Sequence, residues 1–315
     1  MTEYSGDPAH LIPANGKLRR SRAWWRVLFF VALAIAVLAV AGRFALEPGG
    51  PGDRIARVTI AGTILTNRER LEVLNDLAEN DAVKAVIVAI NSPGGTTAGG
   101  EELYEALMAL RATKPVVTVV SELGASAAYM AAIGTDRIFA RRLSIVGSIG
   151  VLYQHVNAGK LLETIGVDLD KVQTGPLKSE PDINEPLEGP ARASLQSLVN
   201  DSFEWFVDIV AERRGLSRPE TLVLADGRIV TGRQGLEFRL IDAIGGEAEA
   251  TAWLEAERAI EADLPVVNYY PLPEPGWTGV TRWLGQSAAE MVRSGVEGAM
   301  SLDGLVSLWH APPSM

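Results

Sequence analysis

The sequence predicts an α/β fold with a mostly parallel sheet, preceded by one N-terminal transmembrane helix. Three observations support this fold class. Short β-rich segments alternate with helical segments from residue 54 onward, which is typical of parallel sheets. Residues 82–91 are nearly all apolar, as expected for a strand covered on both faces. Residues 27–42 contain no charge. The 315 residues are enough to bury a sizeable core.

The N-terminus has the charge pattern of a membrane anchor. Residues 1–26 carry five basic and two acidic side chains, so their net charge is +3. With Trp24 and Trp25 as an aromatic belt, residues 27–46 match the roughly 20 residues that cross ~30 Å of hydrocarbon. A cleaved signal peptide and a buried helix are alternatives, but the long basic region before the apolar segment favours a retained anchor. We therefore expect residues 1–26 in the cytoplasm and the remainder beyond residue 46 outside.

Composition shifts divide the rest of the chain. Residues 47–53 are predicted to be a linker, residues 54–262 the main domain, and residues 263–315 a Pro-rich segment and C-terminal tail. The tail from Trp277 is either an amphipathic helix for a partner or membrane surface, or a segment without fixed structure. The expected strands are 54–64, 82–91, 115–121, 137–140 and 168–175, and the expected helices are 98–112, one starting near Ser126, 189–214 and 246–262.

Charge and composition exclude several functions. The whole chain has a net charge of −10, so the part beyond residue 26 carries −13, whereas nucleic-acid binding needs a basic surface. The absence of Cys excludes disulfides, a Cys nucleophile and thiolate metal sites, and three His residues argue against a multi-His metal cluster. We expect no metal and no cofactor.

Ser126 is the candidate nucleophile. The strand 115–121 leads through a Gly-containing turn to this serine, and a run of small residues follows. That layout places an exposed hydroxyl at a helix N-terminus, where small neighbours allow a substrate backbone to approach and free N–H groups can stabilise an oxyanion. A simple N-cap, worth about 1 kcal/mol, is the alternative interpretation.

A second loop carries paired glycines. Gly94 and Gly95 follow the apolar strand 82–91 in the segment NSPGG. Glycines can turn backbone N–H groups into a site, although an ordinary strand-to-helix turn has the same composition. The loop lacks the spacing of a phosphate-binding motif. We interpret it as one half of an oxyanion hole, with the Ala127 amide as the other half.

A serine nucleophile needs a base. His155 is the only histidine within the main domain, and a packed or surface role is the simpler interpretation of it. Among the six lysines, Lys178 lies on a Gly-Pro loop after the predicted strand 168–175, while Lys84 and Lys114 are near strand starts, at the wrong end of the sheet for a site. A lysine acts as a base near neutral pH only where it is withheld from water.

Taken together, several motifs resemble the bacterial signal peptide peptidase A family, membrane-anchored Ser–Lys proteases with a Clp protease/crotonase-like fold. The resemblance covers about residues 54–262, and the chain is similar to the short, single-repeat members. The motifs are INSPGG (90–95), GASAAYMAA (124–132), IVGSIGV (145–151), TGPLK (174–178) and DGRIVTGRQGLEFRLIDAIGG (226–246).

The resemblance implies a role for each matched residue. It makes Ser126 the nucleophile and Lys178 its general base. It places Gly94, Gly95 and the Ala127 amide at the oxyanion hole, and it gives Ser148 the task of holding the lysine amine, although a packed loop serine is the alternative. Two departures from the family pattern are Ser179-Glu180 after the lysine, where members often have Asp, and Arg239, where a glycine is usual.

The family also implies an assembly and a substrate class. Its short members form ring-like homo-oligomers in which the lysine of one subunit completes the neighbour's site. We expect cleavage of signal peptides or other hydrophobic peptides at the outer, periplasmic side of a bacterial cytoplasmic membrane. The alternatives are a stomatin-partner-type membrane protease with the same chemistry, a crotonase-like acyl-CoA enzyme and a non-catalytic scaffold of this fold.

Overall fold

The computed structural model describes residues 24–34, 52–271 and 306–308. Contacts within the chain define two units, residues 1–52 and residues 53–315. In the first unit, residues 24–34 are helical and their side chains are exposed. No helix among the described residues is both long enough and apolar enough to span a bilayer. The predicted anchor, 27–46, lies partly outside the described residues, as do the linker residues 47–51.

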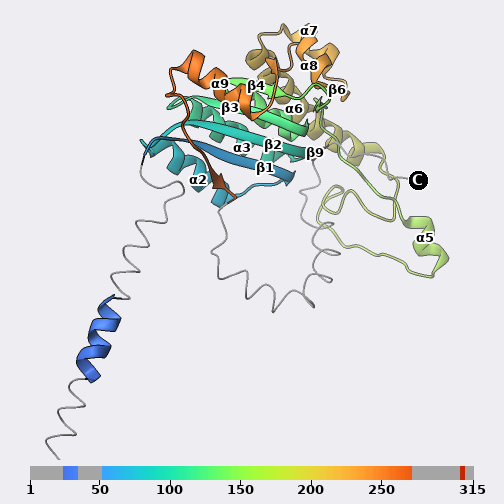
Figure 1. The fold of residues 1–315 in the computed structure, drawn as a ribbon. Helices are drawn as coiled ribbons and strands as arrows, with labels where there is room; N and C mark the ends of the chain where they lie inside the picture. The colour runs from blue at the N-terminus through green and yellow to red at the C-terminus, as the bar shows by residue number, and fades with distance from the viewer. Residues whose placement is uncertain (1–23, 35–51, 272–305, 309–315) are drawn as a thin grey trace, which may run out of the picture. The chain divides into compact units, whose positions relative to one another are not determined.

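The second unit is built around a nine-stranded sheet (Figure 1). Its main strand order is β6-β5-β3-β2-β1-β8; β4 pairs with β3 and β7, and β9 pairs with β2. The strands are β1 (Arg54–Ile64), β2 (Val83–Thr96), β3 (Val116–Ala125), β4 (Arg137–Ala140), β5 (Ile145–Gly147), β6 (Ile229–Thr231), β7 (Ala243–Ile244), β8 (Val266–Tyr270) and β9 (Val306–Leu308). Every strand pair is parallel except β2–β9 and β5–β6, which confirms the predicted mostly parallel sheet.

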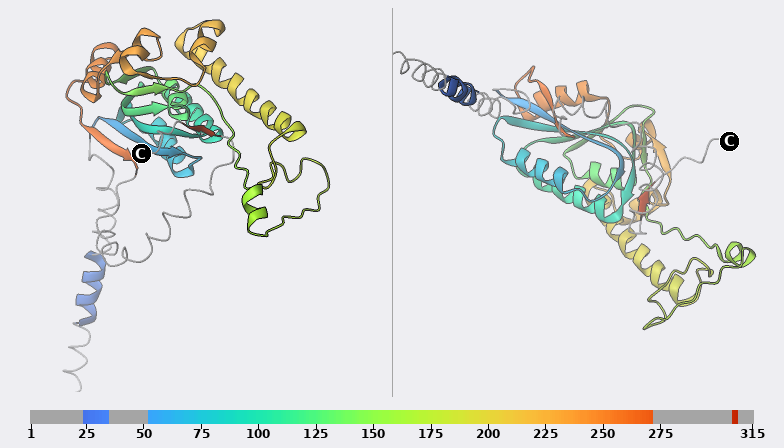
Figure 2. Two further views of the ribbon diagram at one scale, coloured as in Figure 1. Left: turned by 90° about the vertical axis from the view of Figure 1, so that its right-hand side faces the viewer. Right: turned by 90° about the horizontal axis from the view of Figure 1, so that it is seen from below.

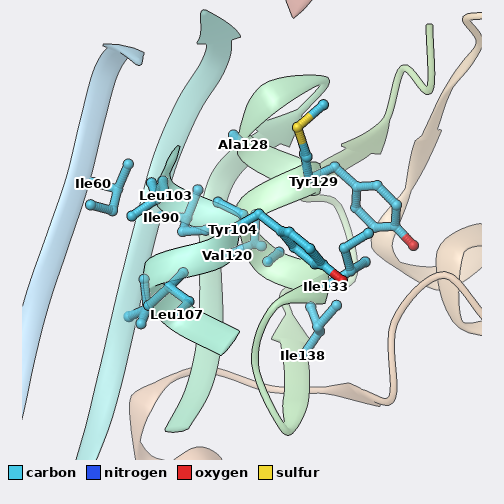
Figure 3. Close-up of a cluster of buried hydrophobic side chains, with 14 of the residues drawn as sticks. Ile60, Ile90, Leu103, Tyr104, Leu107, Val120, Ala128, Tyr129, Ile133 and Ile138 are labelled. Atoms are coloured by element: carbon cyan, nitrogen blue, oxygen red, sulfur yellow. The ribbon is translucent and has the colours of Figure 1, made fainter. Parts of the chain in front are cut away.

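Helices cover both faces of this sheet. They are α2 (Arg68–Glu79), α3 (Thr97–Arg111), α4 (Ala127–Ile133), α5 (Gly159–Thr164), α6 (Gly189–Arg214), α7 (Arg218–Leu224), α8 (Gly232–Glu237) and α9 (Glu247–Arg258). Buried side chains of α2, α3, α4 and α6 form a core with one face of the sheet, and α9 packs on the other face. Figure 3 shows part of the first core, in which Leu103 and Leu107 of α3 lie near Ile90 of β2.

Local sequence explains where the central elements begin and end. The middle of β2 is buried on both faces because its side chains are apolar on both. The Thr96 side chain accepts a hydrogen bond from the Gly99 N–H and so caps α3. At the end of α6, Gly215 adopts a left-handed conformation that stops the helix. These local signals fix the lengths of the elements that carry the candidate site.

Two sequence expectations need correction. Residues 168–175 form no strand; they belong to an extended segment, residues 150–188, that we call the arm. A strand needs a neighbouring edge for its backbone hydrogen bonds, and residues 168–175 pair with no strand among the described residues. The arm extends away from the sheet (Figure 2). Conversely, β8 lies beyond residue 262 and pairs with β1, so the sheet continues into the Pro-rich segment.

Candidate active site

Ser126 lies at the sharp junction between β3 and α4. Its backbone has φ 59° and ψ −122°, a conformation that is strained for a residue with a side chain. The junction is held by two hydrogen bonds, from the Ser126 N–H to the Gly147 carbonyl (2.8 Å) and from the Met130 N–H to the Ser126 carbonyl (2.9 Å). The serine is 1% exposed, and its side chain does not cap α4. The simple N-cap interpretation of Ser126 is therefore wrong.

Ala127 and the paired glycines lie at the same edge of the sheet as Ser126. Ala127 is the first residue of α4 and is buried, and N–H groups of a first helical turn have no partner within the helix. Because Ser92 of β2 pairs with Gly124 of β3, Gly94 and Ser126, which come two residues later, lie at the same end of two adjacent parallel strands. The sheet register thus brings the two predicted halves of the oxyanion hole to one edge.

The backbone of the glycine loop is closely packed. A Cβ atom on Gly95 would lie 1.8 Å from the Ile64 carbonyl oxygen, so a side chain there requires the backbone to move. Gly94 has φ 109°, a region open mainly to glycine. Its N–H donates to the Ser92 hydroxyl (3.1 Å), which in turn donates to the Gly62 carbonyl (2.6 Å). Sequence reasoning missed this anchoring role of Ser92, although the serine lies within the NSPGG motif.

Ser148 follows β5 in the same way that Ser126 follows β3. Ala125 pairs with Gly147 across the two parallel strands, so the two serines come next on neighbouring strands, which lie about 4.8 Å apart in a sheet. Ser148 is buried, has φ 53°, and donates its N–H to the Arg228 carbonyl (2.8 Å). Both serines therefore occupy strained positions at one end of the sheet.

Lys178 is located elsewhere. It is exposed in a turn of the arm, where its backbone N–H donates to the Gly175 carbonyl (3.2 Å). The arm extends away from the sheet in both views (Figures 1 and 2). In a single copy of the chain, Ser126 and the glycine loop therefore lie at one edge of the sheet, whereas Lys178 is exposed to solvent.

Ion pairs organise the arm around a different lysine. The Lys171 amine lies 2.7 Å from an Asp182 carboxylate oxygen and 3.0 Å from a Glu180 oxygen. Hydrogen bonding by Lys171 lowers the pKa of Asp182, and the same contacts raise the pKa of Lys171. These pairs close the segment 171–182, which includes Lys178. His155 lies on the same arm and is partly exposed, with its Nε2 3.1 Å from the Glu185 carbonyl oxygen.

The remaining candidates fall in the core or beside the site. Tyr129 is fully buried, donates its hydroxyl to the Leu240 carbonyl (2.8 Å), and has its pKa raised by burial. It is a core residue and does not line a groove.

A pocket of about 330 Å³, which the sequence did not reveal, includes Met130, one helical turn after Ser126. The pocket is lined by Thr97, Ala98, Glu101, Met130, Asp201, Ser202 and Trp205. No cluster of possible metal ligands occurs among the described residues.

Strand β9 brings a distant segment to the glycine loop. Val306, Ser307 and Leu308 run antiparallel to β2, opposite Thr96, Gly95 and Gly94 respectively. The loop therefore accepts an extended backbone as a sheet partner, which is how many proteins bind peptides.

The similarity of this chain to known proteins supports a peptidase site. The profile of peptidase family S49 matches residues 108–261. A protein of Methanocaldococcus jannaschii named "Putative protease" is 33% identical over 241 residues, covering 76% of this chain and 77% of the relative. A protein of Enterococcus faecium named "Putative signal peptide peptidase SppA" is 31% identical over 263 residues, covering 78% and 74%.

A solved structure of a ClpP1 mutant from Listeria monocytogenes covers 61% of this chain and 92% of its own, with 16% identity and a TM-score of 0.41. The identity and coverage of the Methanocaldococcus jannaschii and Enterococcus faecium relatives, with the S49 profile match, decide the assignment. The chain belongs to peptidase family S49, the serine peptidases similar to signal peptide peptidase A.

Proposed function

We propose that this protein is a membrane-anchored endopeptidase that degrades signal peptides or other hydrophobic peptides at the outer face of a bacterial cytoplasmic membrane. Membership of family S49 and the relative named as a signal peptide peptidase support the substrate class. The basic residues before Trp24 and the apolar segment 27–46 support the anchor and its orientation. A protease tethered beside the bilayer would meet peptides that leave the membrane.

In the proposed reaction, the Ser126 hydroxyl attacks a peptide carbonyl while the Lys178 amine takes its proton. The carbonyl oxygen becomes an oxyanion that accepts hydrogen bonds from backbone N–H groups at Gly94–Gly95 and Ala127. One such donor contributes about 2.7–4 kcal/mol to transition-state stability in comparable hydrolases. Lys178 then protonates the leaving amine, and water hydrolyses the acyl-enzyme to regenerate Ser126.

We propose that Lys178 acts on Ser126 of a neighbouring subunit in a ring. The arm that carries this lysine exposes large apolar side chains: Leu161 and Ile165 are each 63% exposed, and Val172 is fully exposed. Such a surface is costly in water and is typical of a contact between subunits. A neighbour that covers the arm would also withhold Lys178 from water, which favours the neutral amine that a base needs.

The observation that carries the proposal is the strained, buried Ser126 at the start of α4 beside the glycine loop. The test uses the full chain in detergent, a serine-reactive fluorophosphonate probe and a hydrophobic fluorogenic peptide. We expect Ser126→Ala and Lys178→Ala each to lower peptide hydrolysis by at least about 10³-fold. The matched controls Ser121→Ala and Lys160→Ala change exposed residues of β3 and α5 and should stay within about twofold.

Mixing the two inactive variants tests whether the site is shared. If subunits exchange at random and the dyad forms between neighbours, about one site in four contains both an intact Ser126 and an intact Lys178. Recovery to about one quarter of wild-type hydrolysis is expected on this basis. A correctly assembled mixture that stays inactive would contradict pairing between subunits, and hydrolysis that survives both single changes would remove the dyad itself.

The anchor has its own test. The full chain should sediment with membranes, and a chain that begins at residue 47 should not, because the deletion removes the whole apolar segment. Sedimentation of both forms with the membrane would contradict the proposed anchor.

A further inference from the structure

We propose that the pocket between α3, α4 and α6 binds a lysine or arginine side chain of the substrate peptide, close to the bond that is cleaved. The inference deepens the proposed function, because it assumes that peptides are hydrolysed at Ser126. The pocket has a volume of about 330 Å³, near the lower end of the range of about 300–1,000 Å³ for ligand sites. This size suits one long side chain of an extended peptide.

The pocket adjoins both halves of the candidate site. Thr97 and Ala98, the first residues of α3, follow directly after the glycine loop and line the pocket. Met130 also lines it and comes one turn of α4, about 5.4 Å along the helix, after Ser126. Residues of an extended peptide are about 3.3 Å apart. A side chain within three residues of the cleaved bond can therefore enter the pocket.

Close packing of the surrounding helices fixes the apolar surfaces of the pocket. A Cβ atom on Gly100 of α3 would lie 2.9 Å from both the Ala127 Cβ and the Met130 Sδ atoms, so a glycine lets α3 and α4 approach closely. Met130 is 1% exposed and forms the base of the pocket. The Trp205 ring forms a wall, and its edge contact with Tyr104, 5.9 Å between ring centroids, fixes its orientation. These surfaces suit the aliphatic stem of a lysine or arginine.

Two of the helices that border the pocket also supply a carboxylate to it. Glu101 lies one turn after Thr97 on α3, and Asp201 lies one turn before Trp205 on α6. Residues four apart share a helix face, and all four line the pocket. Both carboxylates are exposed, and within the described part of the chain neither forms an ion pair. The pocket thus combines an apolar wall with two carboxylates that can pair with a cationic head group.

Other side chains fit this combination less well. An apolar side chain would withdraw water from the carboxylates without replacing it, which costs free energy, and an acidic side chain would be repelled. Because exposed ion pairs are individually weak, we expect the two carboxylates together to give a preference of about tenfold in kcat/KM. A secretory signal peptide has basic residues before its apolar segment, so the proposed substrate class contains such side chains.

The first experiment uses the full chain in detergent and internally quenched apolar peptides. Arginine, or the uncharged citrulline of nearly the same shape, is placed at each of three positions on either side of the cleaved bond. At one position, kcat/KM should be about tenfold higher for the arginine peptide. The preference should shrink at about 0.5 M salt, because salt screens exposed charges. A ratio near one at every position would overturn the proposal.

Variants assign the preference to the two carboxylates. Glu101→Gln combined with Asp201→Asn should bring the arginine-to-citrulline ratio to within about twofold of one. Glu101→Lys combined with Asp201→Lys should favour a glutamate peptide over its glutamine counterpart, because the charge of the pocket is reversed. The matched control Glu105→Gln changes an exposed carboxylate of α3 outside the pocket and should keep the tenfold ratio. An equal loss in Glu105→Gln would assign the preference to net charge and contradict the pocket.

A binding experiment distinguishes this proposal from the proposed function. Fluorescent arginine and citrulline peptides are titrated into Ser126→Ala protein, which cannot turn over. The arginine peptide should bind about tenfold more tightly, and adding Glu101→Gln and Asp201→Asn should remove the difference. If binding follows this pattern but the wild type hydrolyses no peptide, the pocket stands and the peptidase proposal fails. If the wild type hydrolyses peptides but the two peptides bind equally, the pocket proposal fails and the peptidase proposal stands.

Discussion

The sheet unit and the arm of this protein are stabilised in opposite ways. In the unit, large apolar side chains are removed from water almost completely; Leu107, for example, is 0% exposed. In the arm, Leu161 is 63% exposed and order depends on charged pairs around Lys171. Burial stabilises without a partner, whereas exposed ion pairs contribute little. The difference fits the proposal that a neighbouring subunit covers the arm and so completes the site.

The largest expected effect compares two leucines. Leu107→Ala should lower the free energy of unfolding by about 2–5 kcal/mol, because it leaves a cavity in the core. Leu161→Ala should change the same quantity, measured on separated subunits, by less than about 0.5 kcal/mol, because the side chain is exposed in the single chain. Urea unfolding followed by circular dichroism measures both. A large loss for Leu161→Ala would mean that the arm is part of the folded core.

Lys171→Gln is expected to lower kcat for peptide hydrolysis about 10- to 100-fold, with KM little changed. The substitution leaves the partly exposed carboxylates of Glu180 and Asp182 without their cation, so the segment that carries Lys178 loses its position. A misplacement of about 1 Å can lower the rate 10²-fold. Lys171→Arg keeps the charge and should restore much of kcat. Lys160→Gln, on the same arm, is the control. Unchanged kcat in Lys171→Gln would show that these ion pairs do not position the lysine.

Arg239→Gly should stabilise the unit by about 0.5–1 kcal/mol in urea unfolding. Arg239 follows α8 with φ 62°, a left-handed conformation that costs a residue with a side chain about 1–2 kcal/mol. The loss of its exposed ion pair with Glu220 (3.0 Å) and the added freedom of the unfolded chain offset part of the gain. Arg239→Ala loses the ion pair but keeps the strain, so it should not be stabilising.

The smallest expected effect is a pH dependence confined to the arm. The pKa of Asp182 is lowered from 3.8, so its contribution is complete above that value and is lost as pH falls through the lower, folded pKa. The pKa of Lys171 is raised from 10.5, so its contribution is complete below that value and is lost as pH rises through the higher, folded pKa.

A fluorophore on Lys160→Cys, in a chain with no other cysteine, reports the mobility of the arm. Its anisotropy should be constant between about pH 4 and pH 10 and should fall outside that window. Adding Lys171→Gln should lower the plateau and weaken both transitions. Transitions that persist unchanged in the double variant would assign them to other groups.

The sequence predicted elements well where the signals are local, and it failed where an element depends on contacts distant in the sequence. The bounds 54–64, 137–140 and 189–214 agree with β1, β4 and α6, since apolar patterns and helix-ending glycines are local signals. The predicted strand 168–175 was wrong because a strand depends on a partner edge that its own residues do not reveal. For the candidate site, motifs predicted Ser126 and the glycine loop, and these stay predictions. The anchoring by Ser92 depends on a contact with Gly62, thirty residues earlier, which no motif reveals.

The sequence by itself determined the family, the alternating elements and the residue types for acyl transfer, because motifs and apolar periodicity are written in consecutive residues. Only the tertiary structure decided that Ser126 and Ser148 end adjacent strands, that Lys178 stands apart from them, and that a C-terminal strand pairs with the glycine loop. Those facts depend on strand register and on where backbone groups find partners, which are properties of the folded chain as a whole.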